Sequence, residues 1–198
     1  VENDDVVLNL FCKDCSVYLN RITSKLKGTV FFSATFSPIK YFVNTLGGDS
    51  STDSQLILSS PFPKENLKIM IAPKVSIKYK DRDSSIEDVK QYIRAFVSKK
   101  VGNYFVYVPS YEYLDKLCED FDFDDADCFI QDREMTDIEK EDFLLHFESN
   151  PVKTCIGFLV IGGTFSEGID LVSDRLIGAA VVGIGLPKIN FESDEIAR

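Results

Sequence analysis

Residues 161–171 read Ile-Gly-Gly-Thr-Phe-Ser-Glu-Gly-Ile-Asp-Leu, and this is the most informative segment of the chain. The apolar residues 155–161 have the length and composition of a buried strand. Glycines placed just after such a strand let the backbone approach a ligand closely. Two acids and two hydroxyl groups accompany them. The segment predicts either a ligand-binding turn or a tight strand-to-helix connection without a ligand.

Two further segments place polar residues at the end of an apolar run. Residues 31–38 read Phe-Phe-Ser-Ala-Thr-Phe-Ser-Pro, and residues 104–111 read Tyr-Phe-Val-Tyr-Val-Pro-Ser-Tyr. Open α/β sheets bind their ligands outside the carboxyl ends of their strands. These segments therefore favour the ligand-binding interpretation of the turn.

The order and the amino-acid sequences of these segments resemble those of the iron-sulfur type of superfamily 2 helicases, specifically the DinG and XPD group. The resemblance covers nearly the whole chain, and it extends to shorter stretches before and after the three segments. These stretches are Ser-Pro-Phe-Pro at 60–63, Tyr79-x-x-Arg82, Gly102-Asn103, Arg-Leu-Ile-Gly at 175–178 and Gly-Ile-Gly-Leu-Pro at 183–187. By this resemblance, residues 33–35 are motif III, residues 109–111 lie at motif IV, and residues 162–170 are motif V.

The resemblance implies roles for individual residues. Motif III, formed by Ser33, Ala34 and Thr35, would couple ATP hydrolysis to movement of the nucleic acid. Glu167, Gly168 and Asp170 would contact the nucleotide. The expected nucleic-acid contacts are Arg82, Ser110, Tyr111, Gly163, Thr164 and Ser166.

Physical chemistry supports these roles and leaves alternatives open. A glycine turn can present backbone N–H groups to phosphate, and the hydroxyls of Thr164 and Ser166 are neutral donors. A helix that begins after Ser110 would attract phosphate, and the ring of Tyr111 could stack on a base. The alternatives are a turn capped by Asp170, a helix cap beside a packed tyrosine at 110–111, an ordinary salt bridge at Arg82, and a plain strand-end turn at 33–35.

The chain contains neither a Gly-x-x-x-x-Gly-Lys-Ser/Thr phosphate loop nor an Asp-Glu-x-His magnesium sequence. In the resembling family these elements lie on the first motor lobe, as does the iron-sulfur module, and motif VI would follow residue 198. Residues 1–40 are thus expected to end the first lobe, and residues 41–198 to form most of the second. ATP, Mg²⁺ and a possible iron-sulfur cluster are expected in the full-length enzyme, with single-stranded DNA and the first lobe as partners. The fragment alone is expected to bind none of these cofactors and to be inactive.

Composition agrees with a globular intracellular domain. The 198 residues are 44% apolar, which suits one α/β domain. No segment has the roughly 18 consecutive apolar residues of a membrane helix, and no leader opens the chain. A soluble, cytoplasmic and nucleoid-associated protein is therefore expected, with no membrane partner.

The five cysteines do not form a recognisable framework. They are odd in number and scattered, which argues against a secreted disulfide fold. Cys12-x-x-Cys15 raises the possibility of a metal, but zinc would need two more ligands and His146 is the chain's one histidine. Ordinary reduced thiols are expected, and His146 is expected to be structural.

The charge is unevenly distributed. The net charge of −10 is unfavourable for phosphate contacts, which need Lys and Arg. Residues 64–100, however, hold ten basic and five acidic side chains, whereas residues 112–148 hold fifteen acids and three bases. Both runs can be solvated faces. If the chain binds a nucleic-acid strand, the acidic run should face away from it.

Strands alternate with helices along the chain. Strands are expected at residues 29–33, 103–108, 128–131, 155–161 and 176–182, a further one is possible at 6–10, and 56–58 and 67–72 are expected to be extended. Helices are expected at about 17–26, 39–46, 84–101, 110–120 and 136–148, two of them opened by the capping boxes Ser84/Glu87 and Thr136/Glu139. Phe143, Leu144 and Phe147 should face the sheet.

This order predicts an α/β fold with a mostly parallel RecA-like (P-loop NTPase-like) sheet, right-handed crossovers and helices on both faces. A dinucleotide-binding turn at 183–187 is disfavoured by Pro187 and a missing third glycine. The expected function is the second motor lobe of a DinG-like, ATP-dependent DNA helicase. The alternatives are a non-catalytic interaction module derived from such a lobe, and a nuclease-fused relative.

Overall fold

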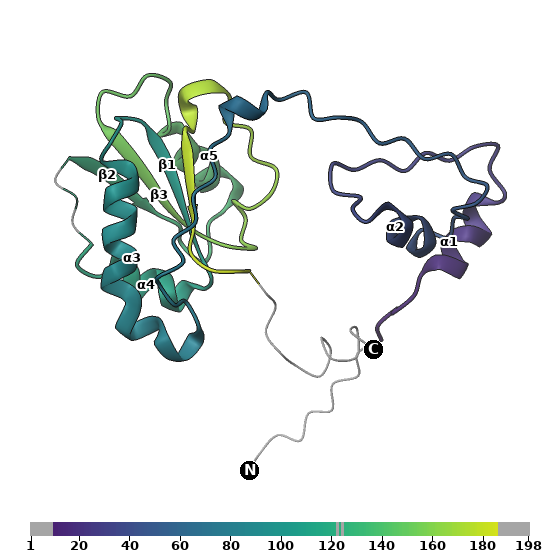
Figure 1. The fold of residues 1–198 in the computed structure, drawn as a ribbon, viewed down its shortest axis with the longest axis horizontal. Helices are drawn as coiled ribbons and strands as arrows, with labels where there is room; N and C mark the ends of the chain where they lie inside the picture. Colours follow the sequence, from purple (N-terminus) through teal and green to yellow (C-terminus); the bar gives the residue numbers. More distant parts are fainter. Residues whose placement is uncertain (1–9, 122, 124, 186–198) are drawn as a thin grey trace, which may run out of the picture. The chain divides into compact units, whose positions relative to one another are not determined.

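The computed structural model describes residues 10–121, 123 and 125–185, and these fall into two compact units. Residues 10–68 form the first unit and residues 69–185 the second (Figure 1). The boundary between these compact units, after residue 68, does not test the expected boundary between motor lobes at residues 40 and 41. The lobe boundary stays a prediction. Among the residues that the structure describes, none of the helices has the length and apolar composition of a membrane span.

The first unit contains the helices α1 (Ser16–Thr23) and α2 (Ile39–Thr45) and the short 3-10 helix η1 (Lys64–Asn66). Both α-helices were predicted. The segment after α2 approaches α1 closely, because the Asn20 side chain donates to the Gly47 carbonyl at 2.7 Å. A Cβ at Gly47 would overlap the Ser16 carbonyl oxygen, and the φ of +78° at this residue also favours glycine.

The strand predicted at 29–33 is wrong. Residues 27–33 contain no strand, and the side chains of Val30 and Phe32 are 83% and 89% exposed. A strand exists only where a neighbouring backbone completes its hydrogen bonds, and no described residue of this unit does so. Residues 56–58 and 67–72, which were expected to be extended, are exposed and form no strand. Of the possible strand at 6–10, Leu10 is not in a strand and the rest lies outside the described residues.

The second unit is built on a parallel sheet of four strands. They are β1 (Asn103–Val108), β2 (Ala126–Ile130), β3 (Thr154–Val160) and β4 (Gly178–Val181). Their spatial order is β2-β3-β1-β4, and every described pair of neighbours is parallel. In the register, Val108 lies opposite Val160 and Ile130 opposite Phe158, so the strands end at a common edge. The predicted parallel sheet is confirmed, and β1 lies in its interior, between β3 and β4.

Helices cover both faces of this sheet, as predicted (Figure 1). On one face, α3 (Arg82–Val97) and α4 (Tyr111–Cys118) bury a stripe of apolar residues against β1 and β3. On the other face, α5 (Asp137–Leu145) and the residues that follow it place Phe143 and Phe147 against Phe105 and Leu159. The remaining elements are the 3-10 helices η2 (Tyr79–Asp81) and η3 (Ser173–Arg175).

Two of the three predicted side-chain helix caps are confirmed. The Ser110 hydroxyl accepts a hydrogen bond from the Tyr113 backbone N–H, and Thr136 and Glu139 form a reciprocal capping box. The capping box at Ser84 and Glu87 is wrong, because α3 begins two residues earlier, at Arg82. The turn η2 leads directly into α3, so Ser84 lies within the first turn of the helix and its hydroxyl donates to the Asp81 carbonyl at 2.9 Å.

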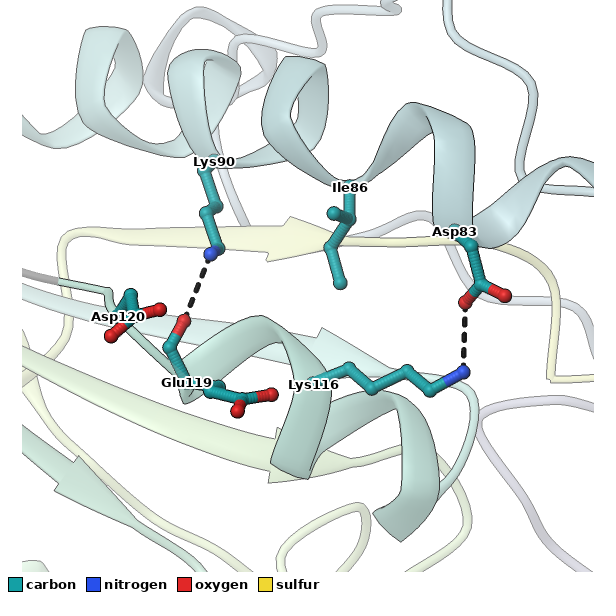
Figure 2. Close-up of a pocket in the computed structure, with 6 residues that line it drawn as sticks. All are labelled: Asp83, Ile86, Lys90, Lys116, Glu119 and Asp120. Atoms are coloured by element: carbon teal, nitrogen blue, oxygen red, sulfur yellow. Dashed lines mark hydrogen bonds and ion pairs between the residues drawn. The ribbon is translucent and has the colours of Figure 1, made fainter.

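A shallow pocket of about 360 Å³ lies between α3 and α4 (Figure 2). The buried Lys90 donates across it to the Glu119 carbonyl at 2.9 Å, and Lys116 pairs with Asp83 at 2.8 Å. None of the predicted site residues lines this pocket. These two contacts hold α3 against α4. Arg82 is the first residue of α3 and Tyr111 the first residue of α4.

Candidate functional site

Apart from Arg82, which begins α3, the predicted site residues of the second unit follow the carboxyl ends of the sheet strands. Ser110 and Tyr111 come after β1, and the motif V turn at 162–170 comes after β3. Parallel strands end at the same edge of a sheet, and open α/β folds bind ligands there. The loop after β2 begins at that edge too, and it supplies a residue that the sequence analysis missed.

That residue is Gln131, whose side chain joins the two segments. Its Oε1 accepts a hydrogen bond from the Val160 backbone N–H at 2.9 Å, and its Nε2 donates to the Tyr111 hydroxyl at 2.8 Å. The same Nε2 lies 3.5 Å from Oγ1 of Thr164. Only 3% of Gln131 is exposed. The structure therefore brings Tyr111 and Thr164 together through one buried amide.

Ser166 holds the motif V turn in shape. Its hydroxyl accepts from the Gly162 N–H at 2.8 Å and donates to the Val160 carbonyl at 3.3 Å. Beside it, the buried Phe165 anchors the turn in the core, and its carbonyl accepts from the Tyr107 hydroxyl at 2.9 Å. Burial raises the pKa of Tyr107, so this donor stays protonated at neutral pH. With its proton engaged, Ser166 could offer a ligand only its remaining acceptor capacity.

The outer part of the turn carries groups that no described residue satisfies. The backbone N–H groups of Thr164, Glu167 and Gly168 find no acceptor among the described residues. Gly168 has a φ of +73°, and a Cβ built on it meets no heavy atom within 4 Å. Glu167 and Asp170 are exposed and pair with no described residue, so the turn-capping alternative for Asp170 is not what the structure shows. Such a turn can donate several backbone N–H groups to an anion. Its two carboxylates can accept hydrogen bonds from a ligand.

Arg82 is held by two aromatic rings. Its guanidinium carbon lies 5.4 Å from the Tyr79 ring centroid and 5.7 Å from that of Tyr113, and its Nε donates to the Ile77 carbonyl at 3.4 Å. Among the described residues it forms no ion pair, in contrast to the salt-bridge alternative. Tyr113 is in the first turn of α4, so Arg82 lies beside the segment that begins with Ser110. Burial raises the pKa of Tyr113, and the charge of Arg82 partly offsets this.

Ser110 and Tyr111 both have structural roles. Ser110 caps α4, as described above. The Tyr111 ring lies 5.0 Å from the guanidinium carbon of Arg133, which pairs with Asp115 at 2.9 Å. The structure thus shows the capping alternative for Ser110, and a base stacking on Tyr111 would have to use the ring face that Arg133 leaves open.

The motif III residues belong to the first unit. The hydroxyls of Ser33 and Thr35 lie 3.1 Å apart, and the Thr35 N–H donates to the Ser33 hydroxyl at 3.1 Å. Ala34 lies between them, and all three are exposed. They form a local polar turn whose coupling role stays a prediction.

The sequence carried one signal for Gln131. It is a polar residue at the end of a predicted strand, the same signal that selected Ser110 and the motif V turn. The sequence carried no such signal for three further residues, Arg133, Tyr107 and Tyr113, because their contacts depend on how the helices and loops pack.

The described part of the chain has no group of three or more His, Cys, Asp or Glu residues that could hold a metal ion. Its five cysteines form no disulfide. Burial raises the pKa of Cys118 to about 12 and also raises that of Cys155. His146 is exposed and stacks on Phe129, with 4.1 Å between ring centroids, a structural contact.

Known proteins share this sequence pattern. A family model described as helicase C-terminal domain matches residues 93–197, more than half of the chain. The ATP-dependent DNA helicase CHL1 of Candida albicans is 23% identical over 222 residues, covering 98% of this chain and 25% of that protein. Its Schizosaccharomyces pombe counterpart is 25% identical over 215 residues, covering 97% and 25%.

A probable ATP-dependent helicase of Methanocaldococcus jannaschii is 27% identical over 165 residues, covering 78% of this chain and 24% of that protein. The chain thus spans about a quarter of the length of these relatives. The matches confirm the resemblance to the DinG and XPD group, and the chain belongs to the helicase C-terminal domain family.

Proposed function

We propose that this chain supplies the second motor lobe of a DinG-type, ATP-dependent DNA helicase, an enzyme that hydrolyses ATP to move along single-stranded DNA. The observation that carries the proposal is the exposed turn at 162–170. Its N–H groups without an acceptor among the described residues, and the Thr164 hydroxyl, lie at the same sheet edge as Tyr111. ATP-dependent helicases among the relatives support the same class of activity.

The nucleic-acid contacts of this lobe are Arg82, Ser110, Tyr111, Gly163, Thr164 and Ser166. Arg82 has the geometry for phosphate, because two rings and the Ile77 carbonyl fix its guanidinium while its terminal nitrogens have no described acceptor. An arginine ordered before binding loses less side-chain entropy when it contacts a phosphate. Ser166 acts mainly by shaping the turn.

Glu167, Gly168 and Asp170 form the nucleotide side of the proposed site. The Gly168 N–H can donate to a phosphate or ribose oxygen, and the two carboxylates can accept from ribose hydroxyls or from basic residues of the first lobe. The phosphate-cradling loop and the magnesium ligands would come from that first lobe, as would any iron-sulfur cluster. When bound, Mg²⁺ would neutralise charge that develops on the transferred phosphoryl group.

The first test is salt-dependent binding of this chain to fluorescent single-stranded and duplex DNA. We expect weak binding to single strands that decreases with salt. Arg82→Ala should weaken binding to a similar extent for every DNA sequence. It should also reduce the slope of log K against log salt by about one, because one phosphate contact is lost.

Lys140→Ala is the charge-matched control, because Lys140 lies on α5 and pairs with Asp137 at 2.8 Å. We expect this variant to keep the wild-type salt slope. Absence of binding at low salt would contradict a DNA contact on this chain alone. Two interpretations would then remain. Either DNA binding requires the first lobe as well, or the chain is the non-catalytic interaction module.

A further inference from the structure

Gln131 contacts both segments to which the proposed function assigns ligands. It lies directly after β2, and it is almost completely buried. A buried amide must satisfy its donors and its acceptor within the protein. Gln131 does so with the β3 backbone at Val160, the ring hydroxyl of Tyr111 and the side chain of Thr164.

The orientation of this amide is fixed by the sheet. The Val160 N–H is a donor only, so Oε1 has to face it and Nε2 has to point the other way. Nε2 then meets two hydroxyl oxygens, and each can accept. A Cβ at Gly163 would lie 3.0 Å from Nε2, so glycine at this position leaves the amide its space. The sheet and the turn together hold the amide between motifs IV and V.

The two bonds made by Nε2 are unequal. The contact with Tyr111 is a short hydrogen bond of 2.8 Å, whereas the 3.5 Å separation from Thr164 is long for one. A small shift of the turn toward the amide would shorten the second bond. A shift of Tyr111 would lengthen the first, and Nε2 could then move toward Thr164 within the range that the bond between Oε1 and Val160 permits. The two motifs therefore share one donor group whose position depends on both.

We propose that Gln131 is a positioning residue that links the nucleic-acid contact at Tyr111, through Thr164, to the motif V turn. The same turn carries the proposed nucleotide contacts at residues 167–170. The inference rests on the proposed function and adds a residue and a physical connection to it. Binding at either segment displaces an oxygen bonded to Nε2, and the displacement changes the preferred position of the other segment. Coupling of this kind is reciprocal for binding.

The test compares ATP turnover of the complete helicase with and without single-stranded DNA. Gln131→Met keeps the side-chain length and removes the amide. We expect the ratio of DNA-stimulated to basal turnover to fall about fivefold or more, the range of ordinary coupling between sites. Destabilisation alone would lower both rates together and leave the ratio unchanged, so the ratio separates positioning from simple structural support.

Gln131→Glu is the conservative variant. One carboxylate oxygen can still accept from the Val160 N–H, and the other can accept from the hydroxyls of Tyr111 and Thr164. We expect it to restore most of the ratio that Gln131→Met loses. A double mutant of Gln131→Met with Tyr111→Phe should lose no more of the ratio than the more affected single variant, because both changes break the same contact.

The outcomes separate the two levels of the proposal. If the wild-type complete protein shows no DNA-stimulated ATP turnover, the proposed function itself fails. If wild type is stimulated and Gln131→Met keeps its ratio within about twofold, or the double mutant shows additive losses, the role of Gln131 is overturned. If Gln131→Met does not fold, the double mutant Tyr111→Phe/Thr164→Val is compared with its two single variants. Additive losses of the turnover ratio in that pair would contradict the link through Gln131.

Discussion

Gly157 lies within β3, where two aromatic rings leave no space for a side chain. A Cβ at this position would be 2.9 Å from Phe105 and 2.9 Å from Phe147, and both residues are fully buried. Gly157→Ala should destabilise the second unit by about 1 to 3 kcal/mol, the usual cost of overpacking. This exceeds the roughly 0.4 to 1 kcal/mol that the substitution gains from a less flexible unfolded chain. Urea unfolding followed by circular dichroism measures the difference.

Gly28→Ala is the control for the added methyl group. A Cβ at Gly28 meets no heavy atom within 4 Å, so we expect a change below about 0.5 kcal/mol. An unchanged unfolding midpoint for Gly157→Ala would show that the two rings can move apart at little cost.

The cysteines should differ strongly in reactivity, because the thiolate is the reactive form. Burial holds the pKa of Cys118 near 12 and raises that of Cys155, whereas Cys12 and Cys128 are exposed. At pH 8, iodoacetamide should therefore modify Cys12 and Cys128 first, as read by peptide mass mapping. Cys118 and Cys155 should react only in urea. Early labelling of Cys118 in the folded chain would contradict its buried position.

At the scale of elements, the two predicted capping boxes provide a direct comparison. Thr136→Ala removes the side-chain cap of α5 and should cost about 1 kcal/mol of unfolding free energy. Ser84→Ala lies inside α3, where alanine is the better helix former, so it should be neutral or slightly stabilising. Both are measured by urea unfolding. Equal losses for the two variants would mean that Ser84 contributes to the helix start after all.

The same comparison shows what sequence patterns cannot resolve within an element. The Ser84/Glu87 and Thr136/Glu139 patterns have the same spacing, yet only the second forms a box. The difference arises before the helix, where η2 supplies an earlier helical turn. The segment at 29–33 shows a related limit, since its apolar residues suit a strand but the described chain gives it no neighbouring strand.

At the scale of the second unit, its buried phenols and thiol make the fold sensitive to alkali. Burial raises the pKa of Tyr104, Tyr107 and Tyr113, and that of Cys118 to about 12. Their stabilising contributions are fully present below the unfolded-state pKa values, about 9 for the thiol and 10 for tyrosine. The contributions are lost as the pH rises toward the folded values. The urea midpoint should therefore decrease from about pH 9 upward.

Two tyrosine variants test this explanation. Tyr107→Phe loses the bond to the Phe165 carbonyl and should cost about 1 kcal/mol at pH 7. The Tyr113 hydroxyl is buried without a partner among the described residues, so Tyr113→Phe should be neutral or stabilising. Both should reduce the alkaline loss. An alkaline slope that stays unchanged in both would mean that other groups dominate it.

The chain as a whole should have negligible ATPase activity, even with single-stranded DNA. Its sequence has no phosphate loop, and phosphoryl transfer needs one together with magnesium and cationic stabilisation. A coupled phosphate-release assay checks this, with an added intact helicase as positive control. DNA-stimulated turnover that copurifies with the chain through a second column would overturn the expectation.

The parallel sheet of the second unit, the starts of α4 and α5 and the motif V turn could be predicted from the sequence alone, because these features depend on local periodicity, caps and glycines. Three features became apparent only in the folded structure: Gln131 joins Tyr111 to Thr164, Arg82 lies against two rings, and Ser84 is not a cap. These features depend on contacts between residues distant in the sequence. Such contacts exist only once the strands have aligned at a common edge, and no local pattern encodes which side chains then meet.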